Sequence, residues 1–312
     1  MSAMRILACF RVTPDYEALR ESEWSAAAGQ GLSSGGGAEA GRGRSTGAGR
    51  GESTGAGRSE GAGPADLVDT RYVRRILDCF DESALELALR LSDAMIGLGG
   101  TAELGALSVG APDAEPHLKT LLALGFERAA RVHTEAALDF APAATAAVVA
   151  AYVRRIDHSE LLMMGARSGP GGDDTVPYRV AERLGWPCLT QVTEGEPLVD
   201  GRLRVTLMTD DGLQRLTAPT PCVLAVGNAV VSHLRVPTLT DRLAVRDRQP
   251  NVLEPADLGV DLAHVLGRET PILTALESVD RRRAGAIITG DTPRAKAQAL
   301  FDARLKSLLE EL

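Results

Sequence analysis

The stretch LLMMGARSGPGGDDTVPYRVAERLG, residues 161–185, decides the fold because it joins a strand, a glycine-rich loop and a helix. Its first four residues are an apolar run typical of a buried parallel strand, and residues 176–184 follow helical spacing up to Gly185. Backbone N–H groups of such a loop, together with the dipole of the next helix, can bind an anion. The stretch therefore predicts a strand–loop–helix unit with a candidate binding loop.

The same alternation runs through the preceding part of the chain. Short apolar runs predict strands at residues 5–10, 104–109 and 129–133, and helical spacing predicts helices at 81–98, 113–124 and 141–155. This order predicts an α/β fold of the Rossmann-like kind, a doubly wound and mostly parallel sheet covered by helices on both faces.

The pattern changes after residue 185. An Asp200–Gly201 turn separates two strand-like runs, and further runs follow at 213–217 and 222–226. We expect these strands to be antiparallel additions at the sheet edge. After residue 227 there is little periodicity until a terminal helix at 292–312, so we expect one α/β domain at 1–226 and an extended C-terminal arm at 227–312 that binds a partner chain.

Residues 26–64 interrupt the first domain. They hold 14 of the 33 glycines and contain the sequence STGAGR twice, at 45–50 and 53–58. Burying this composition would not offset its chain entropy, so we expect a disordered insert.

Composition excludes several classes of function. The 34 basic and 42 acidic residues give a net charge of −8, which disfavours nucleic-acid binding. No apolar run approaches the ~18 residues of a membrane span, so we expect no membrane insertion. The four cysteines form no C-x-x-C pair, and the N-terminus has no cleavage site of the signal-peptide kind. We expect buried thiols and a cytoplasmic protein.

The residues that could act as acids, bases, nucleophiles or metal ligands do not form a known catalytic pattern. The five histidines are scattered without metal-ligand spacing, and no nucleophile elbow is present, so we expect no catalytic residue and no metal. The loop at 165–175 matches neither a phosphate-loop nor a dinucleotide motif. Two alternatives stay open on the residues alone. One is a metal-assisted nucleotide hydrolase or ligase that uses Arg167, Asp173 and Asp174, and the other is a stress-type nucleotide-binding homodimer.

Several stretches resemble the β subunit of electron-transfer flavoprotein. The most specific is DDGLQRL at 210–216, followed by Pro221 and by VLA at 223–225. The other matching stretches are RILACFRV at 5–12, FDE at 80–82, LSVG at 107–110, LLALG at 121–125, AERLGWP at 181–187 and DLGVDL at 257–262. The resemblance covers nearly the whole chain outside the insert.

The resemblance implies an electron carrier subunit that is not an enzyme by itself. Such a subunit forms a heterodimer with an α subunit that holds most of the redox FAD, and it passes electrons from a flavin dehydrogenase to a downstream acceptor. In the family the β subunit also buries AMP, or a second FAD in bifurcating members.

The resemblance also implies a nucleotide site built from four stretches. The positions carried over are Cys9; Asp78, Cys79, Phe80 and Asp81; Val109; and Gly165, Ala166, Arg167, Ser168, Gly169, Pro170, Gly171, Gly172, Asp173, Asp174, Thr175 and Val176. Three of the four stretches follow parallel strands, where open α/β sheets bind ligands.

Two departures from the family pattern are visible. Asp78 and Cys79 stand where the family has Asn-Pro, and the loop that ends at Val176 has lost the family's amide side chains. Residues 228–239 align with the loop that recognises dehydrogenase partners. We expect partner-binding residues there, with Val231 at an apolar tip and Arg235 beside it.

Overall fold

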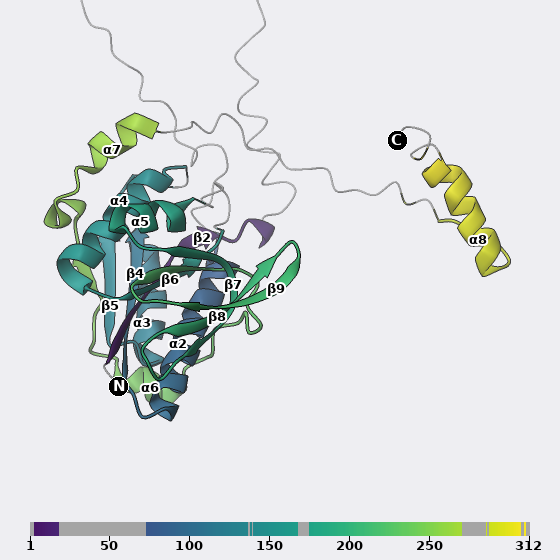
Figure 1. The fold of residues 1–312 in the computed structure, drawn as a ribbon. Helices are drawn as coiled ribbons and strands as arrows, with labels where there is room; N and C mark the ends of the chain where they lie inside the picture. Colours follow the sequence, from purple (N-terminus) through teal and green to yellow (C-terminus); the bar gives the residue numbers. More distant parts are fainter. Residues whose placement is uncertain are drawn as a thin grey trace, which may run out of the picture. The chain divides into compact units, whose positions relative to one another are not determined.

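A nine-stranded sheet has the order β11-β5-β4-β1-β6-β10-β7-β8-β9, and the strands β4 to β9 can be followed in Figure 1. The computed structural model describes residues 3–18, 73–136, 138, 140–167, 175–269, 285, 287–306 and 309. The predicted insert at 26–64 lies outside the described residues. The chain divides into two compact units, Met1–Leu276 and Glu277–Leu312, and the sheet belongs to the first.

The sheet is parallel from β11 to β7 and antiparallel from β7 to β9. Its strands are β1 (Met4–Phe10), β4 (Ala102–Gly110), β5 (Arg128–His133), β6 (Leu161–Gly165), β7 (Cys188–Pro197), β8 (Leu203–Thr209), β9 (Gly212–Ala218), β10 (Cys222–Val226) and β11 (Asn251–Leu253). A separate antiparallel pair joins β2 (Val12–Pro14) to β3 (Arg75–Leu77). The α/β fold with a doubly wound, mostly parallel sheet is confirmed.

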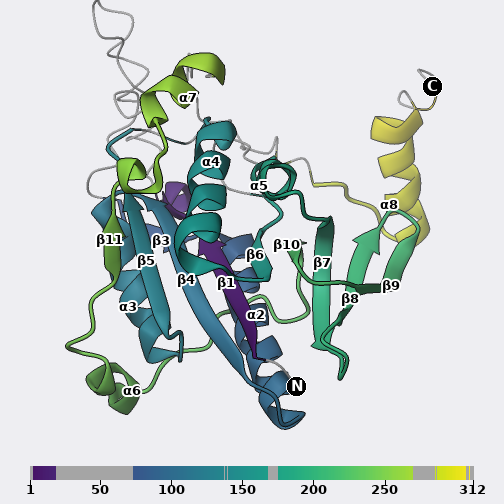
Figure 2. The same ribbon diagram turned by 60° about the vertical axis from the view of Figure 1, so that its left-hand side comes forward.

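Helices cover both faces of this sheet (Figure 2). On one face α2 (Cys79–Gly97) and α3 (Glu115–Ala123) pack in one core cluster, and on the other α4 (Pro142–Tyr152) and α5 (Val176–Leu184) pack in a second. β1 serves both clusters because its side chains alternate, with Ile6 and Ala8 on one face and Leu7 and Cys9 on the other. This double burial explains why residues 6–10 of β1 are all apolar.

Local signals fix where the helices next to the site begin and end. The Asp78 carboxylate accepts a hydrogen bond from the Phe80 N–H at 3.1 Å, which caps the start of α2. Gly185 ends α5 with a φ of 74°, a left-handed conformation that favours glycine.

The prediction that residues 222–226 form an antiparallel edge strand is wrong. β10 lies between β6 and β7, runs parallel to both, and is buried at every residue. Its run Cys-Val-Leu-Ala-Val has no polar alternation, which is the pattern of a central parallel strand. Among the described strands of this sheet, β8 and β9 are the antiparallel additions.

The predicted division after residue 226 does not coincide with the compact units. Within the first unit the chain continues through α6 (Leu239–Ala244) to β11, which pairs with β5, and then to α7 (Leu262–Glu269). Leu262, Val265 and Leu266 of α7 pack against a small cluster near the start of α4. Residues 228–269 therefore belong to the first compact unit, and a C-terminal arm that binds a partner chain stays a prediction.

The second unit contains α8 (Pro293–Leu300), which continues as one wider turn at Phe301–Leu305. The Thr292 hydroxyl caps this helix by accepting the Ala295 N–H at 3.1 Å. A terminal helix is thus confirmed for part of residues 292–312. Among the described helices of both units, none has the length and apolar character that a membrane crossing requires.

Candidate functional site

A pocket opens where the chain order reverses across the sheet. From β1 the chain fills positions β4 and β5 on one side, and it then crosses back to β6 on the other side. The pocket lies at the carboxyl ends of β1, β4 and β6, and its open volume is about 570 Å³, including space continuous with solvent. Open α/β sheets bind ligands in this crevice.

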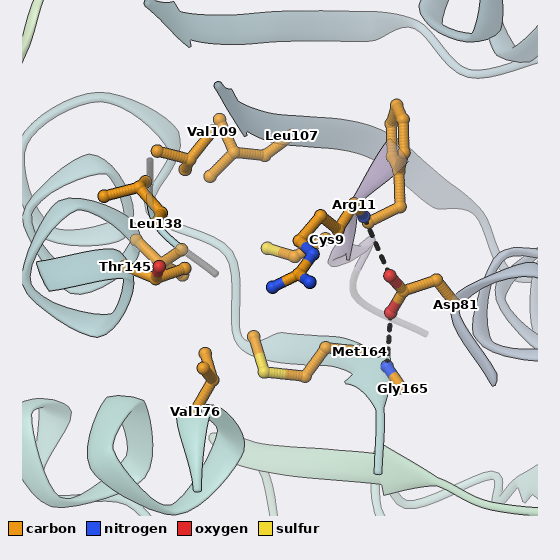
Figure 3. A pocket seen from close by; sticks show the side chains of 12 residues that line it. Cys9, Arg11, Asp81, Leu107, Val109, Leu138, Thr145, Met164, Gly165 and Val176 are labelled. Atoms are coloured by element: carbon orange, nitrogen blue, oxygen red, sulfur yellow. Dashed lines mark hydrogen bonds between the residues drawn. The ribbon is translucent and has the colours of Figure 1, made fainter. Parts of the chain in front are cut away.

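Twelve residues line the pocket, and most of them are apolar (Figure 3). They are Cys9, Phe10, Arg11, Asp81, Leu107, Val109, Leu138, Thr145, Val149, Met164, Gly165 and Val176. Apolar walls combined with a few polar groups are usual for small-molecule sites.

Asp81 ties together the two strand ends that form the floor of the pocket. Its carboxylate accepts the Arg11 N–H and the Gly165 N–H, each at 2.8 Å (Figure 3). These residues are 70 and 84 positions away in the chain. The first turn of α2 is thereby fixed against β1 and β6, and the pocket mouth is preorganised.

Burial, and after it the charge of Asp78, raise the pKa of the Asp81 carboxyl from 3.8 to about 7. The two amide hydrogen bonds act in the opposite direction because they favour the charged form. Asp81 therefore changes charge near neutral pH.

Gly165 is required by the close approach of Asp81. A Cβ atom at this position would lie 2.7 Å from Asp81 Oδ1 and 3.0 Å from the Asp81 backbone nitrogen. Both atoms belong to the anchored start of α2, so neither can move away cheaply. The resemblance placed Gly165 in the binding loop, and the structure gives it a steric role.

Arg11 brings a positive charge into the pocket. Its side chain extends past Cys9 toward Met164 (Figure 3). A guanidinium can bind carboxylate or phosphate oxygens through two parallel hydrogen bonds. The apolar walls and this cation together suit a ligand with a flat apolar part and an anionic part.

The structure brings together five of the sequence-predicted positions, namely Cys9, Asp81, Val109, Gly165 and Val176. Asp78 lies beside them as the cap of α2, and Ala166 is buried directly after Gly165. Cys79, Phe80, Arg167 and Thr175 are not among the lining residues, and three of these four are exposed. Ser168, Gly169, Pro170, Gly171, Gly172, Asp173 and Asp174 lie outside the described residues.

Sequence reasoning missed seven of the twelve lining residues, including both that come from α4. The missed lining residues are Phe10, Arg11, Leu107, Leu138, Thr145, Val149 and Met164. Arg11 had an available signal, because it follows a predicted parallel strand at its carboxyl end. Thr145 and Val149 had none, since a helix of mostly small apolar residues does not show which face meets a ligand.

The thiols do not all behave as expected. Cys9 and Cys222 are buried, Cys188 is half-buried, and Cys79 is exposed, so the prediction of four buried thiols is wrong for Cys79. Cys79 is the first residue of α2 and its side chain lies on the open side of the turn. Burial raises the pKa of the pocket-lining Cys9 thiol well above its usual value, which makes it a poor nucleophile.

Two further predictions concern metals and partners. Within the described residues, no three histidine, cysteine or acidic side chains are grouped closely enough to hold a metal ion. Val231 is 36% exposed, less than its neighbour Val230 at 71%. Arg235 instead binds Glu86 and Asp93 of its own α2 at 2.8 Å each. The partner-binding role of both residues stays a prediction.

Comparison with known proteins identifies what this architecture is similar to. The family model described as electron transfer flavoprotein domain matches residues 67–257. YgcR of Escherichia coli (strain K12), provisionally named an electron transfer flavoprotein subunit, is 30% identical over 98% of this chain and 100% of its own length. The electron transfer flavoprotein β subunit of Bacillus subtilis (strain 168) is 26% identical over 72% of this chain and 84% of its own. The electron transfer flavoprotein β subunit of Homo sapiens is 27% identical over 70% of this chain and 82% of its own length.

Proposed function

The chain belongs to the electron transfer flavoprotein family, and we propose that it works as the β subunit of such a carrier. In this role it passes electrons from a flavin dehydrogenase to a downstream acceptor, together with an α subunit that holds FAD. The relatives named as β subunits, each matched over at least four fifths of its own length, support this assignment. The hydrolase and homodimer alternatives are not favoured by these relatives.

The second part of the proposal is that the chain holds an adenine nucleotide in the pocket at the carboxyl ends of β1 and β6. The nucleotide is AMP or the adenylate half of FAD. Leu107, Val109 and Met164 offer flat apolar surface for a purine ring, and Arg11 offers a cation for phosphate. The residues present therefore fit the group that the family implies.

The residues of this chain bind and orient rather than react. Asp81 fixes the two strand ends, and Gly165 lets α2 approach them closely. The apolar walls exclude water from the ring. FAD, held mainly by the α subunit, supplies the redox chemistry when bound, so the chain itself needs no acid, base or nucleophile.

The partners complete the proposal. The α subunit forms a heterodimer with this chain in the cytoplasm, and residues 228–239 dock a flavin dehydrogenase. We name these residues the docking segment. Exposed apolar side chains at Val230 and Val231 support this assignment, because such side chains are typical of a surface that another protein covers.

Co-expression with the product of the neighbouring reading frame tests the proposed function. We expect a stable heterodimer with the yellow absorbance of bound flavin, and we expect a flavin dehydrogenase to bleach that absorbance when its substrate is added. A colourless homodimer that hydrolyses ATP would contradict the proposal and restore the nucleotide hydrolase.

A further inference from the structure

The docking segment is fixed to the domain near its start and near its middle by hydrogen bonds. Near its start the Val230 N–H donates to the Thr193 carbonyl of β7 at 3.3 Å. Near its middle the Leu234 N–H donates to Glu82 Oε1 at 3.0 Å, and the Arg235 N–H donates to Glu86 Oε2 at 3.0 Å. Both acceptors belong to α2, so one helix holds the second half of the segment.

Arg235 makes the strongest of these attachments. Its Nη2 lies 2.8 Å from Glu86 Oε1, its Nε lies 3.2 Å from both Glu86 oxygens, and its Nη1 lies 2.8 Å from Asp93 Oδ2. The Glu86 side chain is only 6% exposed, whereas that of Arg235 is 38% exposed. A buried carboxylate is costly unless it is paired, and Arg235 supplies both charge and hydrogen bonds to this one.

The apolar side chains of the segment divide into two groups. Ala229 and Leu234 pack against the main core, while Val230, Val231 and Val236 are 71%, 36% and 81% exposed. The polar atoms of Arg235 thus point toward α2, and the valines on either side of it point to solvent. Beside Val230 and Val231 a groove of about 430 Å³, including open space, runs between β7 and the Leu87 and Arg90 side chains of α2.

We propose that Arg235 is a positioning residue, which pairs with Glu86 to hold Val230 and Val231 in the conformation that a flavin dehydrogenase recognises. This inference rests on the proposed function for the identity of the docking protein. It assigns Arg235 to the inner side of the segment, and it gives Glu86, which the sequence did not single out, a part in recognition. α2 then organises two sites, because its first turn meets the nucleotide pocket through Asp81 and its residues Glu82, Glu86 and Asp93 hold the docking segment.

A direct role of Arg235 at the partner's surface makes different predictions. If the guanidinium touched the dehydrogenase, its loss would weaken docking while loss of the buried Glu86 would leave docking unaffected. If the pair acts by positioning, Arg235→Gln and Glu86→Gln have the same effect, and the double variant is no worse than either single one.

Hydrogen exchange of the purified heterodimer tests the positioning step without any dehydrogenase. In Arg235→Gln and in Glu86→Gln we expect the Leu234 and Arg235 amides to exchange at least about tenfold faster than in the wild type. Arg246→Gln is the matched control, because its pair with Asp247 is exposed and lies outside the segment. We expect wild-type exchange in that variant. Unchanged exchange at these amides in Arg235→Gln, the more exposed position, would overturn the inference.

Steady-state reduction by the dehydrogenase that bleaches the wild-type complex tests the consequence. We expect the KM for that dehydrogenase to rise by roughly fivefold in each single variant and in the double variant, with kcat unchanged. Arg235→Lys, which keeps the charge but loses the bidentate geometry, should recover part of the loss. An effect of Arg235→Gln without an effect of Glu86→Gln would overturn the positioning role. A wild-type heterodimer without flavin would contradict the proposed function instead.

Discussion

Two buried aspartates lie at opposite ends of the parallel strands, and their surroundings differ. We call the side where the strands begin the amino edge of the sheet and the side where they end the carboxyl edge. At the amino edge Asp157 is 1% exposed, lies 3.1 Å from Arg128 Nε, and accepts the Ser159 hydroxyl. At the carboxyl edge Asp81 accepts two backbone amides and faces an open pocket. The first carboxylate is enclosed by side chains, whereas the second leaves room for another molecule.

This difference shows how one sheet divides stability and binding between its edges. A carboxylate paired with an arginine fixes the strands beside it and offers no space for a ligand. A carboxylate held by amides fixes two strand ends while the pocket beside it stays open. We therefore expect changes at Asp157 to affect folding alone, and changes around Asp81 to affect the bound nucleotide as well.

The largest effect is expected at the amino edge. Asp157→Asn leaves Arg128 without its buried partner, and we expect the free energy of unfolding to fall by roughly 2–4 kcal/mol, slightly below the cost for a fully buried pair because Arg128 is 25% exposed. Denaturant titration measures the loss. The folded variant should keep its nucleotide, and a nucleotide-free but equally stable variant would contradict the division between the edges.

A substitution at Gly165 should lower stability by less, but it should abolish binding of the nucleotide. Gly165→Ala forces a Cβ against Asp81, so we expect a loss of about 1–3 kcal/mol and release of the nucleotide. Gly195→Ala is the control, because a Cβ there meets only Leu91 side-chain atoms at 3.5 Å or more. Both variants are compared by thermal unfolding and nucleotide content. Retention of nucleotide by Gly165→Ala would show that the ligand lies elsewhere.

The smallest effect over a single pH unit belongs to Asp81, whose titration makes stability depend on pH. The folded protein keeps the Asp81 proton up to its pKa of about 7, whereas the unfolded chain releases it near 3.8. Stability from this group is therefore full below about pH 4 and is lost as pH rises to 7, by at most about 1.4 kcal/mol per pH unit.

Asp81→Asn removes this titration. The difference in unfolding free energy between wild type and variant, measured from pH 4 to 8, should change with pH up to 7 and then level off. A difference that stays constant across the range would mean that Asp81 is ionised throughout, and that its two amide hydrogen bonds outweigh its burial.

The sequence predicted the fold where one residue pattern has one structural meaning. The apolar run at 5–10 and the glycine at 185 specify a buried strand and a helix end by local rules. The position of residues 222–226 in the sheet is not local, because it depends on which neighbouring strands leave a space. The uninterrupted apolar run at 222–226 indicated a buried parallel strand. The closeness of these residues in sequence to the predicted antiparallel strands favoured the wrong interpretation.

The site was harder to predict for the same reason. Asp81 and Glu82 read as the acidic first turn of a helix, and stabilisation of that helix explains both without further contacts. In the structure Asp81 bridges strand ends 70 or more residues away, and Glu82 accepts the Leu234 N–H from a distance of 152 residues. Such long-range roles follow from the fold and not from spacing. Family resemblance alone brought Asp81 into the predicted site.

The central claim is that the pocket at the carboxyl ends of β1 and β6 holds an adenine nucleotide in a flavin-carrying heterodimer. The most direct measurement is mass analysis of the small molecules released when the co-expressed complex is denatured. We predict FAD together with AMP at about one equivalent per heterodimer, or about two equivalents of FAD, and loss of one adenine nucleotide in Gly165→Ala but not in Gly195→Ala. A complex that releases no adenine nucleotide beyond the FAD of the α subunit would contradict the claim.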